Sequence, residues 1–382
     1  MGVEVTTNYP YFSAEMIADI VEQSVSERNA TMDKQGYYMT PTMAKDEIGY
    51  DTVEFAFAVP VELSYTIASR LPIPDHYKHY NQMATNQYFD ADGVKVGEQA
   101  KWSKRKILNL EVNINHDVGS VKVAGSIPKF LYSSNLHLSQ PYDIVLLTDN
   151  LSKVMGVNRE TLQQARVMRV DVAANMILES AVDSCLLSLG DAKGFHRHKE
   201  WQPLTSIYWC NSRKRMERAS DVIIAYDKLA EMRGRKVKIP SEYDNKNLLR
   251  IEERLKTQTI KKVFTQHITL SQLSTDNVFL SLKSKLIENF KQMDKHEVGN
   301  MDNFKSSSIT KPSDVSKIYI SMAVTAYSED MPIEIAVKMS PLNDKQRYVA
   351  KKQIERLITA IDGGNIVGEL NQKIASFSNV VP

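Results

Sequence analysis

The chain has 382 residues, of which 42% are hydrophobic and 25% charged, the proportions of an ordinary globular protein. No run approaches the roughly 20 apolar residues of a membrane-spanning helix, so we expect no membrane segment. The N-terminus lacks a basic region followed by an apolar stretch, so no secretory signal is expected either. Only two cysteines are present, Cys185 and Cys210, too few for a disulfide framework or a four-ligand zinc site. These features predict a protein of a reducing cytoplasm.

The distribution of charge is more informative than its total. The formal net charge is only +2, but basic residues cluster at 101–106, 213–218 and 233–238. A single cluster of this kind is usually a solvated loop. Three clusters around one set of reactive residues favour a surface that binds phosphates.

The elements expected in the first 125 residues begin with a helix and continue with strands. They are a helix over 14–25, a strand over 52–59 that ends at Pro60, a hairpin over 88–96 that turns at Asp92 and Gly93, a strand over 107–114, and a strand over 120–123 paired with it. Residues 1–50 are expected to be an N-terminal accessory segment.

The middle of the chain mixes helices and strands without a repeating βαβ order. We expect helical segments over 150–155 and 159–165, a strand over 167–173, a helix over 181–189, strands over 205–209 and 221–226, a helix over 228–232 and a strand over 248–255. This order predicts an α+β fold in which a central, mostly antiparallel sheet with flanking helices carries the active site. The catalytic domain is expected to span residues 51–270.

After residue 270 the sequence changes character. Amphipathic helices are expected over 277–293 and 345–361, separated by a polar stretch around 306–313. Residues 271–382 are therefore expected to form a smaller, helical C-terminal domain.

Three of the predicted strands carry charged or phenolic groups two residues apart. Residues at i and i+2 of a strand share one face, so each set would point the same way. The sets are Arg169 with Asp171, Tyr226 with Lys228, and Arg250 with Glu252 and Arg254. Two carboxylates, a tyrosine and several cations on one sheet face suit a metal-assisted attack on a phosphodiester.

Five short segments occur in the chain in this order: Ser126–Asn135, Arg169–Asp171, Ser206–Trp209, Ala225–Lys228 and Leu249–Lys256. Together they resemble the replication initiators of filamentous bacteriophages, the gene II/X class. They are more distantly similar to the initiators of small staphylococcal rolling-circle plasmids. No single motif is specific, but their order and spacing together are, and the likeness covers roughly residues 50–265.

The resemblance implies an enzyme that nicks one DNA strand at a phage or plasmid origin and rejoins it on termination. It implies a 5′-phosphotyrosyl intermediate, a free 3′-OH primer and a divalent metal, Mg²⁺ or Mn²⁺. The expected partners are the double-stranded origin and single-stranded DNA, with a host replication helicase and a dimer on DNA as possibilities.

Within this interpretation Tyr226 is the nucleophile. A phenol with a pKa near 10 needs a nearby cation or metal to ionise at neutral pH, and Lys228 would supply that field or protonate the departing 3′ oxygen. Asp171 and Glu252 are the expected metal ligands, since hard divalent ions prefer carboxylate oxygen. The alternative for the carboxylates is a pair of structural salt bridges, Asp171 with Arg169 and Glu252 with Arg254.

The remaining candidate residues would hold DNA. Guanidinium groups bind phosphate in a bidentate manner, lysines act as point charges, and a loop over Ser126–Asn135 could hold the backbone. The expected DNA-binding residues are Lys129, Asn135, Arg169, Arg250, Arg254, Arg213 and Arg215. His196, Arg197 and His198 resemble a metal-binding pair of histidines only loosely, and we expect them in a polar surface loop.

Two other functions remain open from the sequence. The chain could be a non-catalytic origin-binding protein whose carboxylates are structural, or a metal-dependent nuclease that activates water instead of Tyr226. The sequence also leaves open whether Tyr243 or a second subunit takes part in rejoining.

Overall fold

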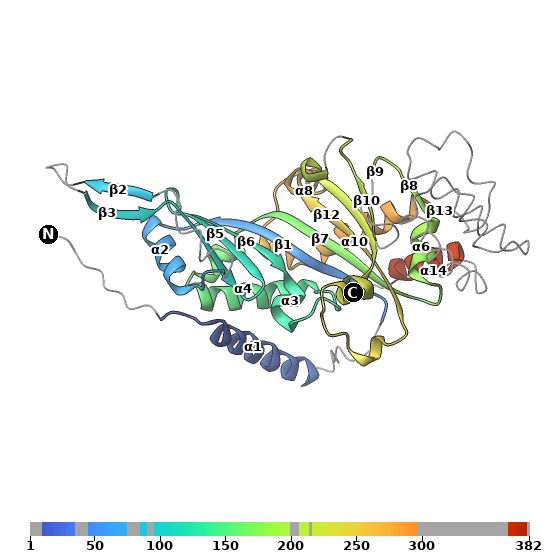
Figure 1. Cartoon of the computed structure of the whole chain (residues 1–382), viewed down its shortest axis with the longest axis horizontal. Helices are drawn as coiled ribbons and strands as arrows, with labels where there is room; N and C mark the ends of the chain where they lie inside the picture. Colours follow the sequence, from blue (N-terminus) through green and yellow to red (C-terminus); the bar gives the residue numbers. More distant parts are fainter. Residues whose placement is uncertain are drawn as a thin grey trace, which may run out of the picture. The chain divides into compact units, whose positions relative to one another are not determined.

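A computed structural model describes residues 10–34, 45–74, 85–89, 95–198, 206–213, 216–295 and 366–379. The expected turn at Asp92 and Gly93, the polar stretch 306–313, the expected helix over 345–361 and Arg215 lie outside the described residues. The described strands and helices confirm the predicted α+β class, with a large antiparallel sheet and flanking helices (Figure 1).

The main sheet has nine strands, and their order in space differs from their order in the chain. From one edge to the other they are β4 (Trp102–Ile107), β5 (Leu110–Asn115), β6 (Ser120–Ser126), β1 (Glu47–Ala58), β7 (Arg166–Leu178), β12 (Asn247–Lys256), β11 (Asp221–Asp227), β10 (Ser206–Cys210) and β9 (His196–His198). The expected pairing of the strand at 120–123 with its predecessor is confirmed by the β5–β6 ladder. The strands expected at 205–209 and 221–226 also pair, as β10 and β11.

Contacts divide the chain into two compact units, which we describe one at a time. The first unit comprises Met1–Pro41, Gly49–Ala173 and Arg254–Lys283, and the second comprises Thr42–Ile48, Ala174–Glu253 and Ser284–Pro382.

The core of the first unit follows the alternation of its strands. Val53, Phe55 and Phe57 of β1 are buried, while the residues between them are half-buried. Phe55 lies opposite Val123 of β6 in the antiparallel ladder. The turn before β6 uses Gly119 at φ +60°, where a side chain would collide with the carbonyl of Val59.

The single strand expected over 107–114 is wrong. The chain turns at Leu108 and Asn109, and Ile107 pairs with Leu110 across a two-residue hairpin. Leu108 has φ +54°, a conformation for which Asn or Gly is the usual sequence signal. Because leucine stands there instead, the sequence did not indicate a turn. The Asn109 side chain fixes the hairpin by donating a 2.8 Å hydrogen bond to the carbonyl of Ser126.

Helices complete the first unit, and several begin at capping residues. They are α1 (Ala14–Lys34), α2 (Val61–Arg70), α3 (Ile127–Tyr132), α4 (Pro141–Met155), α5 (Arg159–Gln163), α8 (Thr257–Phe264) and α9 (Leu270–Leu273), followed by α10 (Asp276–Lys291). The loop expected over Ser126–Asn135 is wrong in its first part. Ser126 is the N-cap of α3, and its side chain accepts from the backbone of Lys129.

Helix α1 is longer than the predicted 14–25 and packs against α3 and α4 (Figure 1). Arg28 fixes it there. Its guanidinium donates to Asp143 at 3.1 Å and to the Tyr132 hydroxyl at 3.3 Å, and lies 3.7 Å from the Tyr142 ring centroid. Asp143 also accepts from the backbone of Gln140, so one buried carboxylate both caps α4 and holds α1.

The second unit places helices beside the other strands. Its elements include α6 (Val182–Ser188), α7 (Lys228–Gly234), α14 (Ile366–Asn379), the short helices η2 (Met216–Arg218) and η3 (Ser241–Tyr243), and a two-stranded sheet of β8 (Leu189–Ala192) and β13 (Met293–Lys295). Helix α14 packs on α6 (Figure 1). Its Glu369 accepts from the backbone of Glu179 and Ser180, which fixes the end of β7.

Three smaller findings concern the sequence expectations. Strands β2 (Thr85–Phe89) and β3 (Lys95–Ala100) pair as the predicted hairpin. No helix in the described part of the chain is long and apolar enough to cross a membrane. Cys185 and Cys210 are both free and buried.

His116 makes a testable contact in the first unit. It is 1% exposed, stacks on Tyr65 and lies 2.8 Å from both Ser64 Oγ and Ser103 Oγ. Ser64 Oγ already donates to the carbonyl of Val61, so we assign Nδ1–H as donor to Ser64 and Nε2 as acceptor from Ser103. With this assignment the neutral imidazole satisfies both contacts.

Burial lowers the pKa of His116, and the charge of Arg105 lowers it further against the opposing effect of Asp117. The unfolded chain therefore takes up the proton first as the pH falls, and the contribution to stability is full above about pH 6.5 and lost below it. We expect His116→Gln to cost about 1–3 kcal/mol at pH 7.5 and to flatten the fall in stability between pH 7 and 5, measured by urea unfolding.

The matched control is His267→Gln, because the pKa of the exposed His267 is also lowered by its surroundings. An equal loss of stability at pH 7.5 in both variants would contradict the role given to the buried ring.

Candidate active site

Tyr226 lies near the end of β11 and is half-buried. It packs beside Tyr208 against the buried cluster that contains Val222 and Ile224, which occupy the same face of the strand. Its hydroxyl donates to Glu252 Oε2 of β12 at 3.4 Å, a long hydrogen bond. The phenol is therefore packed on one side and directed at a carboxylate on the other.

The prediction that Lys228 shares a strand face with Tyr226 is wrong in its geometry. Strand β11 ends at Asp227, and Lys228 is the first residue of α7. Asp227 caps this helix by accepting from the backbone of Ala230 at 2.8 Å, which explains why the strand stops there. Lys228 nevertheless lies near the tyrosine, because its Nζ is 5.8 Å from the ring centroid of Tyr226.

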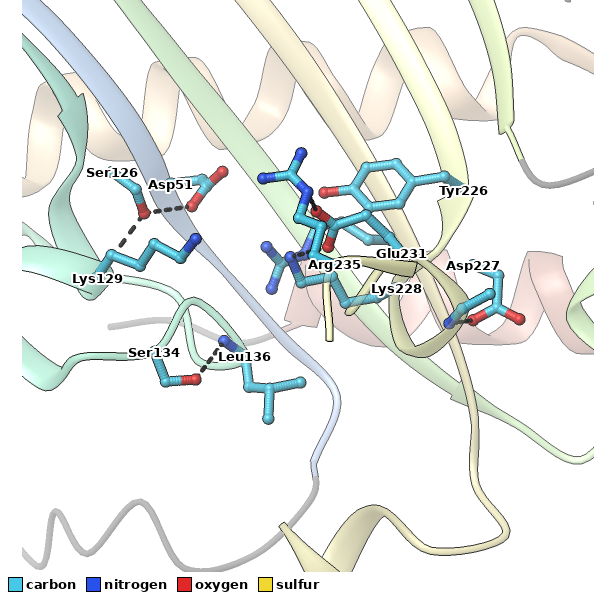
Figure 2. Close-up of polar contacts among 12 residues, drawn as sticks. Asp51, Ser126, Lys129, Ser134, Leu136, Tyr226, Asp227, Lys228, Glu231 and Arg235 are labelled. Carbon is cyan, nitrogen blue, oxygen red and sulfur yellow. Dashed lines mark hydrogen bonds and ion pairs between the residues drawn. The ribbon is translucent and has the colours of Figure 1, made fainter. Parts of the chain in front are cut away.

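Glu231 is a residue of this site that the sequence interpretation missed. The buried Lys228 Nζ donates to Glu231 Oε2 at 2.9 Å, and Arg235 pairs with Oε1 at 2.6 Å (Figure 2). Burial alone would raise the pKa of Glu231, but the hydrogen bond and charge of Lys228, with Arg235 and Arg250, lower it below its usual range. The spacing of three and four residues to the cations was the available signal.

Arg250 is fully buried, at 0% exposure. Its Nε donates to Asn175 Oδ1 at 2.7 Å, and Asn175 donates to Glu47 Oε1 at 2.7 Å. An arginine buried in this way supports the packing of β7 and β12 and is not on the surface where it was expected to clamp phosphate. Asn175 and Glu47 were not singled out in the sequence.

The opposite face of β11 and β12 carries a second buried ionic cluster. Lys285 of α10 donates to Asp221 Oδ2 at 2.8 Å and to Glu253 Oε1, and Asn289 donates to the same Glu253 oxygen at 2.8 Å. Burial, with a smaller contribution from Asp221, raises the pKa of Glu253 to about 8 against the opposing effect of Lys285. The raised pKa favours the protonated form of Glu253. The neighbouring residue in the chain, Glu252, lies on the other face of the strand.

A neutral side chain at position 253 tests this assignment. Because the pKa of Glu253 is raised in the fold, its contribution to stability is full below about pH 4.5 and is lost as the pH rises toward 8. We expect Glu253→Gln to be more stable than the parent by on the order of 2 kcal/mol at pH 9 and nearly equal to it at pH 5, measured by denaturant unfolding.

Lys285→Met is the comparison variant. It leaves Asp221 and Glu253 without their cation and should cost about 3–5 kcal/mol, with the larger loss at high pH. A Glu253→Gln variant that is less stable than the parent at pH 9 would contradict a protonated Glu253.

In the first unit Asp171 is 0% exposed and lies between two arginines. Arg169 on the same strand donates to both carboxylate oxygens, with 2.7 Å between its Nε and Oδ1, and Arg254 donates to Oδ2 at 3.4 Å. The predicted shared face of Arg169 and Asp171 is confirmed. The salt bridge between them, weighed as the structural alternative, is formed, and Arg254 also pairs with Asp171.

The other candidate DNA contacts lie at separate places in their units. Lys129 follows the N-cap Ser126, whose hydroxyl donates to Asp51 Oδ1 at 3.0 Å (Figure 2). Asn135 is half-buried just after α3. Arg213 is exposed and its Nε lies 3.4 Å from His196 Nε2.

The histidine motif is not in a loop as expected. His196–His198 forms β9, which pairs with β10, and the Arg197 guanidinium lies 5.8 Å from the Trp209 ring centroid. No group of three or more His, Cys, Asp or Glu side chains placed to hold a metal occurs among the described residues. The histidines are therefore part of a sheet edge rather than of a metal centre in this part of the chain.

The two predicted metal ligands differ in how well they fit. Mg²⁺ keeps several waters and needs only one or two protein carboxylates, completing its shell with substrate phosphates. Glu252, beside the Tyr226 hydroxyl, fits this chemistry. Asp171 does not fit as it stands, because both of its oxygens accept from Arg169 and it would have to exchange a guanidinium for the ion.

The comparison with known families addresses the identity of the chain. Residues 89–277 match the family described as Replication-associated protein G2P N-terminal. The chain belongs to this family of phage replication initiators. The matched segment includes β7, β11 and β12, so it contains Tyr226, Asp171 and Glu252. A search of curated proteins gave no match to the initiator.

The two roles considered for Asp171, structural ion pair and metal ligand, predict different behaviour of the variant Asp171→Ala. If the carboxylate balances Arg169 and Arg254, Asp171→Ala leaves two neighbouring cations and should cost about 1–3 kcal/mol with or without Mg²⁺. The control is Asp149→Ala, which breaks the partly exposed pair of Asp149 with Arg159 and should cost less than about 1 kcal/mol. Unchanged stability of Asp171→Ala, together with lost Mg²⁺ binding, would show instead that Asp171 is a ligand.

Proposed function

We propose that this initiator nicks one DNA strand at its replication origin with Tyr226 as the nucleophile, and rejoins the strand when replication ends. The observation that carries the proposal is the hydrogen bond from the Tyr226 hydroxyl to Glu252, 3.4 Å long, at the end of a strand followed by a buried lysine. Membership of a phage replication-initiator family supports the DNA substrate.

The phenol needs a route for its proton. Glu252 is the acceptor in contact with the Tyr226 hydroxyl, so it takes the proton as the oxygen approaches phosphorus. The ammonium of Lys228, held by Glu231, adds a fixed positive field 5.8 Å from the ring that favours the phenolate. Lys228 is 1% exposed, so it acts through this field and not as the acid for the leaving group.

The step is a transesterification. The phenolate oxygen forms a bond to phosphorus while the bond from phosphorus to the 3′ oxygen breaks, and water protonates the 3′ oxygen. Tyr226 then carries the 5′ end and the free 3′-OH primes synthesis. Attack of a 3′-OH on the phosphotyrosine reverses the step and rejoins the strand, with Glu252 returning the proton.

A divalent metal is part of the proposal. Mg²⁺ or Mn²⁺ bound by Glu252 would polarise a non-bridging phosphate oxygen and stabilise the charge that builds on phosphorus. A host helicase is proposed as a partner because a nick alone does not unwind a duplex.

Tyr243 is a poor candidate for a second nucleophile. It is 2% exposed, and burial raises its pKa to about 12, with Glu47 and Glu242 adding to the effect. We therefore propose that rejoining uses Tyr226 again or a second copy of the initiator.

A non-catalytic origin-binding protein is the second candidate function. The double pairing of Asp171 with Arg169 and Arg254 favours it, because this carboxylate already has a structural role. The Tyr226–Glu252 contact favours the enzyme.

The direct test is nicking of supercoiled DNA that carries the origin of the initiator's own replicon, with Mg²⁺, with Mn²⁺ and with chelator. We expect Tyr226→Phe to lose at least about 10³-fold in rate, since it has no nucleophilic oxygen, with DNA binding nearly unchanged. Tyr208→Phe is the matched control, because Tyr208 packs on the same cluster as Tyr226. Nicking by Tyr226→Phe at the rate of the parent would remove the central residue of the proposal.

A further inference from the structure

The segment that follows α7 is strongly basic and exposed. Within six residues it carries four cations, and the stretch 232–241 contains no acidic residue. The four cations, all exposed, are Arg233, Arg235, Lys236 and Lys238. The nearest acidic residue before them, Glu231, already pairs with Lys228 and Arg235.

The backbone holds these cations in a defined place. Lys236 N–H donates to the carbonyl of Arg233 and Val237 N–H donates to that of Met232, both at 3.0 Å, which is the Schellman pattern at a helix end. Met232 is buried, so the turn is anchored to the core of its unit. Lys236 has φ +57° at the position where this motif favours glycine. A lysine therefore occupies a backbone conformation that glycine adopts more easily.

The position of the segment relative to Tyr226 follows from the helix. Helix α7 begins two residues after Tyr226 and has 7 residues. At a rise of about 1.5 Å per residue, its far end lies roughly 10 Å along the axis from the end that adjoins the tyrosine. Phosphates along one strand of DNA are spaced about 3.4 Å apart in the axial direction, so this length corresponds to roughly three nucleotides.

Other cations first expected to hold DNA have partners within the fold. Arg250 is fully buried on Asn175, and Arg169 and Arg254 pair with Asp171. The exposed cations after α7 differ from these. Arg235 pairs with Glu231, but Lys236 and Lys238 have no acidic residue within three positions on either side in the sequence. Exposed lysines and arginines without nearby acids are the groups that release counterions on binding phosphates.

We propose that residues 233–238 bind the backbone of the DNA strand about three nucleotides from the phosphate that Tyr226 attacks. This inference rests on the proposed function for the position of the scissile phosphate. The segment holds the strand through charge alone, so it sets affinity and the register of the strand without reading bases.

The test compares two triple variants with equal loss of charge. Arg233→Gln/Lys236→Gln/Lys238→Gln removes three of the segment's four cations and keeps Arg235, which pairs with Glu231. The control, Arg166→Gln/Lys261→Gln/Lys262→Gln, removes three exposed cations of the first unit. Binding of each protein to single-stranded oligothymidylate is measured over a range of salt concentrations.

We expect the slope of log K against log salt to become shallower by roughly 2 in the first variant, since each phosphate contact contributes about 0.7 with single strands. The control should keep the parent slope. An unchanged slope in the first variant, or an equal change in both, would overturn the proposal, whether or not the parent nicks.

A second measurement tests the distance. Single methylphosphonate linkages, which carry no charge, are placed along an oligonucleotide that spans the nick mapped with the parent. The linkage about three nucleotides from the nick should weaken binding of the parent and leave the first variant unaffected. A parent that binds DNA but never nicks would defeat the proposed function, while the salt slopes would still decide whether this segment holds the backbone.

Discussion

The pairing of β11 with β12 is the constraint on which the candidate active site depends. These neighbouring strands carry Tyr226 and Glu252 on one face, with 3.4 Å between the hydroxyl and the carboxylate. On the other face Lys285 joins Asp221 of β11 to Glu253 of β12. One cation therefore ties together the same two strands whose register sets the distance between the proposed nucleophile and its proposed base.

The charges of the site are arranged so that each reactive group has a fixed partner. Lys228 is buried and held by Glu231, which Arg235 holds in turn. An ammonium fixed in this way needs little reorganisation when negative charge develops on a neighbouring phenol, which is how preorganised electrostatics lower a barrier. Asp227 places this lysine by ending the strand and capping α7.

The sequence predicted the elements of the site better than their geometry. The strands that became β7, β11 and β12 could be recognised from apolar runs, and the family resemblance over the middle of the chain agrees with the family match at 89–277. The position of Lys228 could not, because a capping aspartate after a strand and a charged residue within a strand look alike in sequence. The hairpin at Leu108 was missed for a similar reason, since its residue is apolar at a position of positive φ.

The burial of individual charged side chains also could not be predicted from the sequence. Arg250 and Arg254 are equivalent in the pattern Arg-Ile-Glu-Glu-Arg, yet Arg250 is fully buried on Asn175 and Arg254 is partly exposed beside Asp171. Glu253 was not among the candidate residues, yet it is a buried acid bound by Lys285 and Asn289 of α10. Each outcome depends on residues more than 30 positions away, which a local pattern cannot report.

The measurement that tests the account most directly is the identity of the amino acid that carries DNA after nicking. The initiator would be reacted with its origin DNA, digested with nuclease and protease, and its peptides analysed by mass spectrometry. The account predicts a nucleotide attached to the peptide that contains Tyr226 and to no other tyrosine. A nucleotide on a different residue, or nicked DNA with no modified peptide, would contradict it.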